Sequence, residues 1–504
     1  MRLLLIILVF CLSLACKTTH REVTKSPPNI IVFLVDDMGW QDTSVPFWDR
    51  HTELNTQFNT PNMERLAAKG VKFTQAYATP VCSPSRVSLI TGTNAARHRV
   101  TNWTLRKDVS QDRIDSILTF PQWNMNGLSP IRGIHHTFHA TLLPQILKNS
   151  GYQTIHAGKS HLGAIGTPGE FPENIGFDVN IAGHAAGGLA SYFGKDNFGN
   201  KGEHSSVWAV PGLEKYHGKD IYLTEAITQE ALSVLDTIVG KRPFFLHLSH
   251  YAVHVPLMAD SRYYQKYKER GLDDKEAKYA SMIEGMDKSL GDVMSFLENR
   301  GIADNTIILF ISDNGGLSAV GRGGEAHSHN RPLKSGKGSM YEGGIRVPML
   351  AYWPGVTKPS TVINDYVIIE DFFPSILEMA QIEPNPIIQK IDGQSFVPIL
   401  KGKRSNVERP LIWHYPNKWD AEGPGIASSS TIRMGDWKLI YYHKTQEKEL
   451  FNIKEDIGET SNLFEQRPSI AKKLINELSS YLRSVEAQMP IDNRTGKVIP
   501  YPHL

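Results

Sequence analysis

The sequence contains continuous apolar runs, separated by segments in which apolar residues recur every three or four positions. The runs at 29–35, 243–249 and 306–312 are rich in Ile, Leu, Val and Phe and do not alternate with polar residues. This pattern predicts strands that are buried on both faces of a largely parallel sheet. Residues 152–157 predict a further, shorter strand.

Amphipathic segments lie between these runs. Residues 60–70 predict a short helix with Thr60 as its N-cap and Pro61 at its first position. A second helix is predicted at 140–151, where it ends at a glycine, and a long structural helix at 278–299. Together the strands and helices predict an α/β fold.

The character of the sequence changes beyond position 398. Residues 432–441 predict a hairpin with a glycine turn, and residues 471–485 predict a closing helix. We therefore divide the chain into a large domain at 29–398 and a small C-terminal α+β domain at 399–504, with an antiparallel sheet.

The first 28 residues predict export. Arg2, an apolar run at 3–12 and small residues up to Ala15 are typical of a secretory signal peptide, residues 1–15, which is too short to span a bilayer. Cys16 follows as the expected lipidation site of a bacterial lipoprotein, with simple cleavage after Ala15 as the alternative. Residues 16–28 would then tether the protein to a membrane, facing the periplasm or the cell surface.

Charge and cysteine content narrow the possible partners. Lys and Arg total 54 and Asp and Glu total 52, so no global charge favours nucleic acid or direct binding to a membrane surface.

Of 3 cysteines in the sequence, Cys11 is removed with the signal peptide and Cys16 would carry lipid. Cys82 would remain as the single free thiol, which excludes a disulfide framework. Such a thiol in an oxidising compartment needs burial or chemical conversion.

Two of the predicted strands end in acidic or amide residues. Asp36-Asp37 follows the run at 29–35, and Asp313-Asn314 follows the run at 306–312. Ligand sites in such sheets gather at the carboxyl ends of strands, and buried carboxylates need a compensating charge. Four oxygen-bearing side chains suit calcium or magnesium and do not suit zinc.

Cys82 opens the most informative motif, Cys82-Ser83-Pro84-Ser85-Arg86, which is continued by SLITG at 88–92. It resembles the C-x-P-x-R signature of the formylglycine-dependent (type I) sulfatases of the alkaline phosphatase superfamily. In that family a formylglycine-generating enzyme oxidises the cysteine, and the hydrated aldehyde is the nucleophile. The motif also precedes an apolar helical turn at 87–91, and a helix N-terminus favours an anionic substrate.

Further segments are similar to family motifs in the same order. GKSHLG at 158–163 resembles G-K-W-H-L-G, with Ser160 in place of tryptophan. His254, just before Val255-Pro256, matches a family histidine, and His250 is the competing candidate. Residues 332–348 resemble P-L-x-x-G-K-G-x-x-x-E-G-G-x-R-x-P, and within them Lys337 matches the lysine that contacts the sulfate.

The resemblance implies a fold and a set of roles. The fold is an alkaline-phosphatase-like catalytic domain, with a central mixed, mostly parallel sheet flanked by helices, and a small C-terminal domain. Formylglycine at position 82 would attack sulfur, and His254 would protonate the leaving oxygen with help from Lys337. His161 would take the proton when the aldehyde re-forms. The other implied roles are positive charge from Arg86 and Lys159, and calcium binding by Asp36, Asp37, Asp313 and Asn314 together with residue 82.

The sequence specifies the substrate less closely than it specifies the reaction. A sulfated polysaccharide or oligosaccharide is expected, of the carrageenan, ulvan or glycosaminoglycan type. The candidate contacts are Trp103, Trp123, His327, His329 and Lys334, and each tryptophan has core packing as its equal alternative. The alternative functions are a phosphodiesterase or phosphonate monoester hydrolase of the same superfamily, and a non-catalytic lipoprotein that binds glycans.

Overall fold

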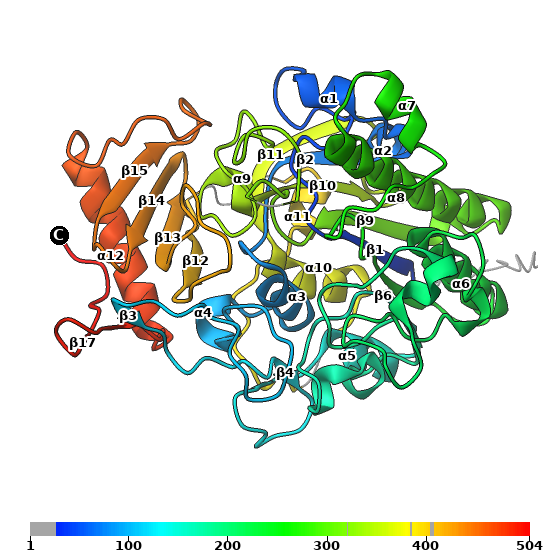
Figure 1. The fold of residues 1–504 in the computed structure, drawn as a ribbon, viewed down its shortest axis with the longest axis horizontal. Helices are drawn as coiled ribbons and strands as arrows, with labels where there is room; N and C mark the ends of the chain where they lie inside the picture. Colours follow the sequence, from blue (N-terminus) through cyan, green and yellow to red (C-terminus); the bar gives the residue numbers. More distant parts are fainter. Residues whose placement is uncertain (1–26, 320, 384–385, 404–407) are drawn as a thin grey trace, which may run out of the picture.

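The computed structural model describes residues 27–319, 321–383, 386–403 and 408–504. The expected signal peptide, Cys16 and most of the tether lie outside these residues. Within the described ranges, no helix combines the length and the apolar character that a membrane crossing requires. A large domain and a smaller sheet with its own helix lie side by side (Figure 1).

A mixed sheet of eight strands forms the centre of the large domain (Figure 1). β10 runs antiparallel to both of its neighbours, and the other neighbouring pairs are parallel. The predicted apolar runs are four of these strands, which confirms the α/β prediction. In spatial order the strands are β11 (Thr361–Ile368), β2 (Val71–Tyr77), β10 (Arg346–Tyr352), β9 (Thr306–Ser312), β1 (Asn29–Val35), β8 (Phe244–Ser249), β6 (Gln153–Gly158) and β7 (Val179–Ile181).

β1 shows why these runs are continuously apolar. Ile30, Val32 and Leu34 pack into the core on one face of the sheet. Ile31, Phe33 and Val35 pack into the core on the other face. Successive side chains of a strand point to opposite faces, so a strand covered on both sides needs an apolar residue at every position. Each such side chain contributes roughly 1.5–3 kcal/mol by its burial.

Helices cover both faces of this sheet. α2 (Pro61–Lys69), α6 (Leu223–Ile238) and α8 (Asp274–Asn299) pack on one face. α3 (Cys82–Thr91), α5 (Leu143–Asn149) and α10 (Phe372–Met379) pack on the other. The remaining helices are α1 (Glu53–Gln57), α4 (Ala95–His98), α7 (Tyr264–Glu269), α9 (Glu342–Ile345) and α11 (Val397–Leu400).

The N-terminus of α2 departs from the prediction. Thr60 occupies the N-cap position, but its side chain makes no capping hydrogen bond and instead contacts Thr43 and Ser44. Asp287 of α8 takes this role, because its carboxylate accepts from the backbone N–H groups of Asn62 and Met63 at 3.0 and 2.8 Å. The cap therefore comes from a residue distant in sequence, which a local pattern does not reveal.

The small domain contains an antiparallel sheet of four strands, ordered β12-β13-β14-β15. The predicted hairpin is β13 and β14, and helix α12 (Pro468–Ser484) packs on the sheet. A short strand from the large domain, β3 (Leu118–Thr119), pairs with β16 (Ile491–Asp492) near the C-terminus. The strands of the four-stranded sheet are β12 (Leu411–Tyr415), β13 (Ser429–Met434), β14 (Trp437–Tyr442) and β15 (Lys448–Asn452). β17 (Lys497–Val498) pairs with β16, and β4 (Leu128–Ser129) and β5 (Phe138–His139) form a separate pair.

Candidate active site

The two predicted polar strand ends meet in space. β1 and β9 are parallel neighbours in register, with Val35 opposite Ser312, so both chains leave the sheet at the same edge. Oxygen atoms of Asp36, Asp37 and Asp313 lie within 4.8 Å of one another, and all three side chains are fully buried. Asn314 joins them by donating from Nδ2 to Asp37 Oδ1 at 2.8 Å.

Lysines from two other segments reach these carboxylates. Lys159, which follows β6, places Nζ 2.5 Å from Asp36 Oδ2. Lys337, from the loop after β9, places Nζ 2.6 Å from Asp37 Oδ1. Burial alone would raise the pKa of Asp37, but Lys337, His254 and Lys159 hold that pKa well below its usual range. Burial raises the pKa of Asp36 to about 8, with Asp313 adding to the effect and Lys159 opposing it.

Arg86 connects the helix α3 to the strand ends. Its Nε and Nη2 lie 2.9 and 2.7 Å from Asp313 Oδ2. Its Nη1 donates to the Lys159 carbonyl at 2.8 Å and to Ser249 Oγ at 2.7 Å. Ser249, the last residue of β8, donates in turn to the Lys159 carbonyl. One guanidinium therefore fixes the relative positions of α3 and the strand ends of β9, β6 and β8.

Cys82 is the first residue of α3 and only 4% exposed. No side chain caps this helix, so its free N–H groups lie beside the cysteine. Burial raises the pKa of the Cys82 thiol, Lys159 and Lys337 oppose that rise, and Asp36 and Asp313 add to it. The thiol therefore lies among the lysines and carboxylates of this cluster.

Two histidines complete the cluster, and their hydrogen bonds define their tautomers. His161 Nε2 lies 2.8 Å from the Thr104 carbonyl and must donate to it, which leaves Nδ1 with the lone pair. His254 Nδ1 donates to the Val255 carbonyl at 2.7 Å, and its Nε2 lies 3.8 Å from Asp37 Oδ2. His250, the competing candidate, instead contacts Ser289 of α8 through Nε2.

The cluster suits a hard divalent cation. Among the described residues, Asp36 Oδ1 and Asn314 Oδ1 are buried oxygens without a protein hydrogen-bond donor. The Asn314 amide nitrogen is already engaged, so its oxygen is the free atom. Three carboxylates face three cationic side chains (Arg86, Lys159 and Lys337), so a divalent ion would leave the site positive and able to attract an anion.

Three of the five proposed substrate contacts have their polar atoms engaged within the protein. Trp123 is fully buried, and its Nε1 donates to Asp112 at 2.9 Å, so no ring face is open to a sugar. Lys334 donates to the Glu459 carbonyl at 3.1 Å and lies over the Tyr341 ring, where it binds the small domain. His329 uses both ring nitrogens inside its own loop, with Ser318 and the Gly323 carbonyl.

Trp103 and His327 are half-buried. Their proposed contacts with substrate stay predictions.

Sequence reasoning missed several residues of the site. Ser249 carried a usable signal, since it is a polar residue at the end of a predicted strand. Thr104 carried none, because it acts through its backbone carbonyl. Gly187 packs directly on the His161 ring, where a Cβ atom would lie 2.1 Å from Cε1. Trp419, in the loop after β12, has its ring centre 5.9 Å from Lys337 Nζ.

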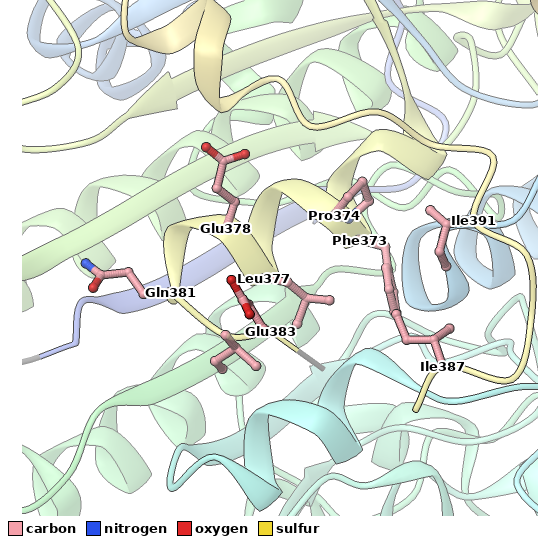
Figure 2. Close-up of a pocket in the computed structure, with 9 residues that line it drawn as sticks. Phe373, Pro374, Leu377, Glu378, Gln381, Glu383, Ile387 and Ile391 are labelled. Atoms are coloured by element: carbon pink, nitrogen blue, oxygen red, sulfur yellow. The ribbon is translucent and has the colours of Figure 1, made fainter. Parts of the chain in front are cut away.

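A separate groove lies along α10. It has a volume of about 510 Å³ and is lined mainly by apolar side chains, among them Phe373, Leu377 and Ile391 (Figure 2). None of the residues described above lines it. The groove therefore plays no part in the candidate site.

Comparison with known protein families identifies the chain. A family model described as Sulfatase matches residues 28–382. The chain belongs to the sulfatase family. It is a sulfuric ester hydrolase with an alkaline-phosphatase-like fold, as the Cys82 motif indicated. A second model, N-sulphoglucosamine sulphohydrolase, C-terminal, matches residues 335–488 of this sulfatase.

Individual relatives align along most of the chain. A sulfatase of Formosa agariphila is 30% identical, over 97% of this chain and 94% of its own. N-acetylgalactosamine-6-sulfatase of Mus musculus is 33% identical, over 78% of this chain and 69% of its own. The crystal structure of Ps i-CgsB in complex with k-i-k-neocarrahexaose is 26% identical with a TM-score of 0.69, and the match covers 91% of this chain and 93% of that one.

Proposed function

We propose that this sulfatase hydrolyses sulfate esters on a sulfated glycan, with formylglycine at position 82 and a bound calcium ion. The observation that carries the proposal is the convergence of Cys82, Arg86 and the four oxygen-bearing side chains at one sheet edge. The substrate class is supported by the relatives, one of which holds a carrageenan-derived hexasaccharide and another of which is named for N-acetylgalactosamine 6-sulfate.

Asp36, Asp37, Asp313 and Asn314 would hold the calcium ion, together with residue 82. When bound, the ion supplies positive charge for the sulfate oxygens. An aldehyde hydrate at position 82 would supply the attacking oxygen. Both groups fit the site because the cluster holds two buried oxygens without donors, and because Cys82, at a helix N-terminus, interacts with Asp36 and Asp313 of that cluster.

The chain's own residues bind the sulfate and move the protons. Lys159 and Lys337 pair with Asp36 and Asp37, so their ammonium groups lie within the cluster and can contact sulfate oxygens. His254 already donates from Nδ1 to the Val255 carbonyl, so its Nε2, 3.8 Å from Asp37 Oδ2, can donate a proton to the leaving alcohol when the ring carries a second proton. His161, held by the Thr104 carbonyl, presents the Nδ1 lone pair and can accept a proton.

The N-terminal segment supports a proposal for the cellular location of the enzyme. Signal cleavage followed by lipidation of Cys16 would place the enzyme on a membrane, facing the periplasm or the cell surface. Retention of a lipid-modified N-terminal peptide, detected by mass spectrometry of protein purified from membranes, tests this part.

The decisive experiment measures inorganic sulfate release. The panel contains sulfated neocarrahexaose, N-acetylgalactosamine 6-sulfate, ulvan oligosaccharides and glycosaminoglycan disaccharides. The enzyme is co-expressed with a formylglycine-generating enzyme, and Cys82→Ala is the blank. We expect sulfate release from at least one sugar class, absent in the blank, with formylglycine at position 82 in the mass spectrum.

Two outcomes would contradict the proposal. Full conversion of Cys82 with no sulfate released, but with turnover of phosphate or phosphonate esters, favours the phosphoesterase alternative. Glycan binding that is the same in the wild type and in Cys82→Ala, without any ester hydrolysis, favours the glycan-binding lipoprotein.

A further inference from the structure

Trp419 belongs to the small domain but lies at the edge of the catalytic cluster. It occupies the loop between β12 and β13, and its ring is half-buried. Lys337 Nζ lies 5.9 Å from the ring centre and also 2.6 Å from Asp37 Oδ1. The aromatic ring is therefore separated from the carboxylate cluster by a single lysine.

The backbone beneath the ring is shaped to receive it. A Cβ atom on Gly338 would lie 2.3 Å from Trp419 Cε3, so only glycine allows this close approach. Gly338 also has φ of +89°, a conformation that favours glycine. The residue after Lys337 thus lets the tryptophan lie directly against the active-site loop.

The large domain holds the Trp419 loop in place through one carboxylate. Asp112 accepts from the Lys418 backbone N–H at 3.2 Å and from Asn417 Nδ2 at 3.0 Å. It also accepts from Trp123 Nε1 at 2.9 Å. The Arg113 N–H donates to the Lys418 carbonyl at 3.1 Å. These bonds to the two residues that precede Trp419 fix its position relative to the catalytic domain.

The side of the cluster next to Trp419 is the side on which the leaving group would lie. His254 and Lys337 both contact Asp37, at 3.8 and 2.6 Å, and they are the residues proposed to protonate the leaving oxygen. The His254 side chain is 17% exposed, whereas that of Asp37 is fully buried, so this side opens outward. In a sulfated glycan the leaving oxygen belongs to the sugar.

We propose that Trp419 is a specificity-determining residue whose indole ring stacks on the sugar that carries the sulfate. This inference rests on the proposed function, since it takes the leaving group to be a sugar. An aromatic face binds the apolar C–H face of a pyranose, and an indole ring offers a large, rigid apolar surface for such a contact. The small domain thereby supplies part of the substrate site.

The test compares Trp419→Ala and Trp419→Phe with the wild type on sulfated neocarrahexaose and N-acetylgalactosamine 6-sulfate. We expect Trp419→Ala to raise KM roughly tenfold and to change kcat far less, because about 1.4 kcal/mol of binding is lost. Trp419→Phe keeps an aromatic face, so KM should rise less than about threefold. Trp48→Ala is the matched control, a half-buried tryptophan with Arg50 4.1 Å from its ring centre and no contact with the site.

Binding of desulfated neocarrahexaose, followed by calorimetry, adds a readout that does not depend on turnover. It should weaken in Trp419→Ala and persist in Trp48→Ala. An active wild type with unchanged KM and unchanged sugar binding in Trp419→Ala overturns this inference alone. A wild type that releases no sulfate from any glycan, despite converted Cys82, overturns the proposed function first and the inference with it.

Discussion

Arg86 and Asp313 form a two-contact ion pair in the interior of the protein. Nε and Nη2 lie 2.9 and 2.7 Å from the same carboxylate oxygen, and neither side chain has any exposed surface. The pair joins the second turn of α3 to the end of β9. It therefore connects the residue expected to become the nucleophile with the carboxylates expected to hold the metal.

Arg86→Ala should lower the free energy of unfolding by about 3–5 kcal/mol, because it leaves Asp313 buried without its partner. Arg86→Lys should recover only part of this loss, since one ammonium group cannot replace a planar fork of donors. Urea denaturation followed by circular dichroism measures both variants.

Arg50→Ala is the control for the ion-pair prediction. Arg50 pairs with Asp49, but the two side chains are 66% and 72% exposed. Solvent-exposed pairs contribute little, so this variant should shift the unfolding free energy by less than about 0.5 kcal/mol. Equal losses of unfolding free energy in Arg86→Ala and Arg50→Ala would show that the buried pair contributes no more to stability than the exposed one.

Calcium should stabilise the folded enzyme. A ligand that binds only the folded state adds about 2.7 kcal/mol at a concentration 100 times its Kd. Protein treated with a chelator should regain stability when calcium is added, and Asn314→Ala should lose at least part of this gain because it lacks the free amide oxygen. Thermal unfolding at several calcium concentrations measures the effect.

A second group of metal-ligating side chains provides the control for the calcium prediction. Asp108, His135 and His136 lie close enough to share an ion, on the protein surface. Asp108→Ala should leave the calcium-dependent shift intact. If that variant abolishes the calcium-dependent shift and Asn314→Ala does not, the ion binds at the surface group of Asp108 and not at the candidate active site.

Replacement of His254 should lower kcat most on esters whose leaving group is poor. Proton donation by a positioned side chain contributes about 10²- to 10⁴-fold, and a leaving oxygen of low basicity needs less of it. His254→Ala should therefore lose at least about 100-fold in kcat on a sugar sulfate, and much less on 4-nitrophenyl sulfate. Equal losses on both esters would remove His254 from the role of acid.

The sequence allowed the cluster of acidic and amide side chains to be predicted because each half of it is a local pattern. An apolar run ending in Asp36-Asp37 and another ending in Asp313-Asn314 identify strand ends, and parallel strands bring such ends to one edge. Predicting that these four side chains meet therefore required no knowledge of long-range contacts. The same logic applied to Ser249 at the end of β8 would have found it as well.

The substrate side could not be predicted in this way. The position of Trp123 depends on Asp112, and Asp112 in turn binds donors from the small domain. The proximity of Trp419 to Lys337 depends on how two domains pack, and no periodicity in either segment encodes it. Aromatic residues in irregular loops thus look alike in sequence, whether they are buried or open to a ligand.

Glu370 should make stability depend on pH. It is buried and accepts from Asn94 Nδ2 at 2.9 Å. Burial, with Asp371 adding to it, raises the pKa of Glu370 to about 8, whereas an unfolded glutamate titrates near 4.3.

Between about pH 4 and pH 8, only the folded state keeps this proton, so the free energy of unfolding falls as pH rises. Below this window both states are protonated, and above it neither is.

Glu370→Gln removes the titration but keeps the acceptor for Asn94. The variant should therefore gain stability relative to the wild type from pH 5 to pH 8, by up to roughly 1.4 kcal/mol per pH unit. Urea denaturation at each pH measures this difference, and Glu378→Gln, whose parent side chain is 42% exposed, should track the wild type. Parallel pH profiles for Glu370→Gln and the wild type would mean that Glu370 is ionised in the folded protein, with the Asn94 donor and the surrounding backbone sufficient to hold its charge.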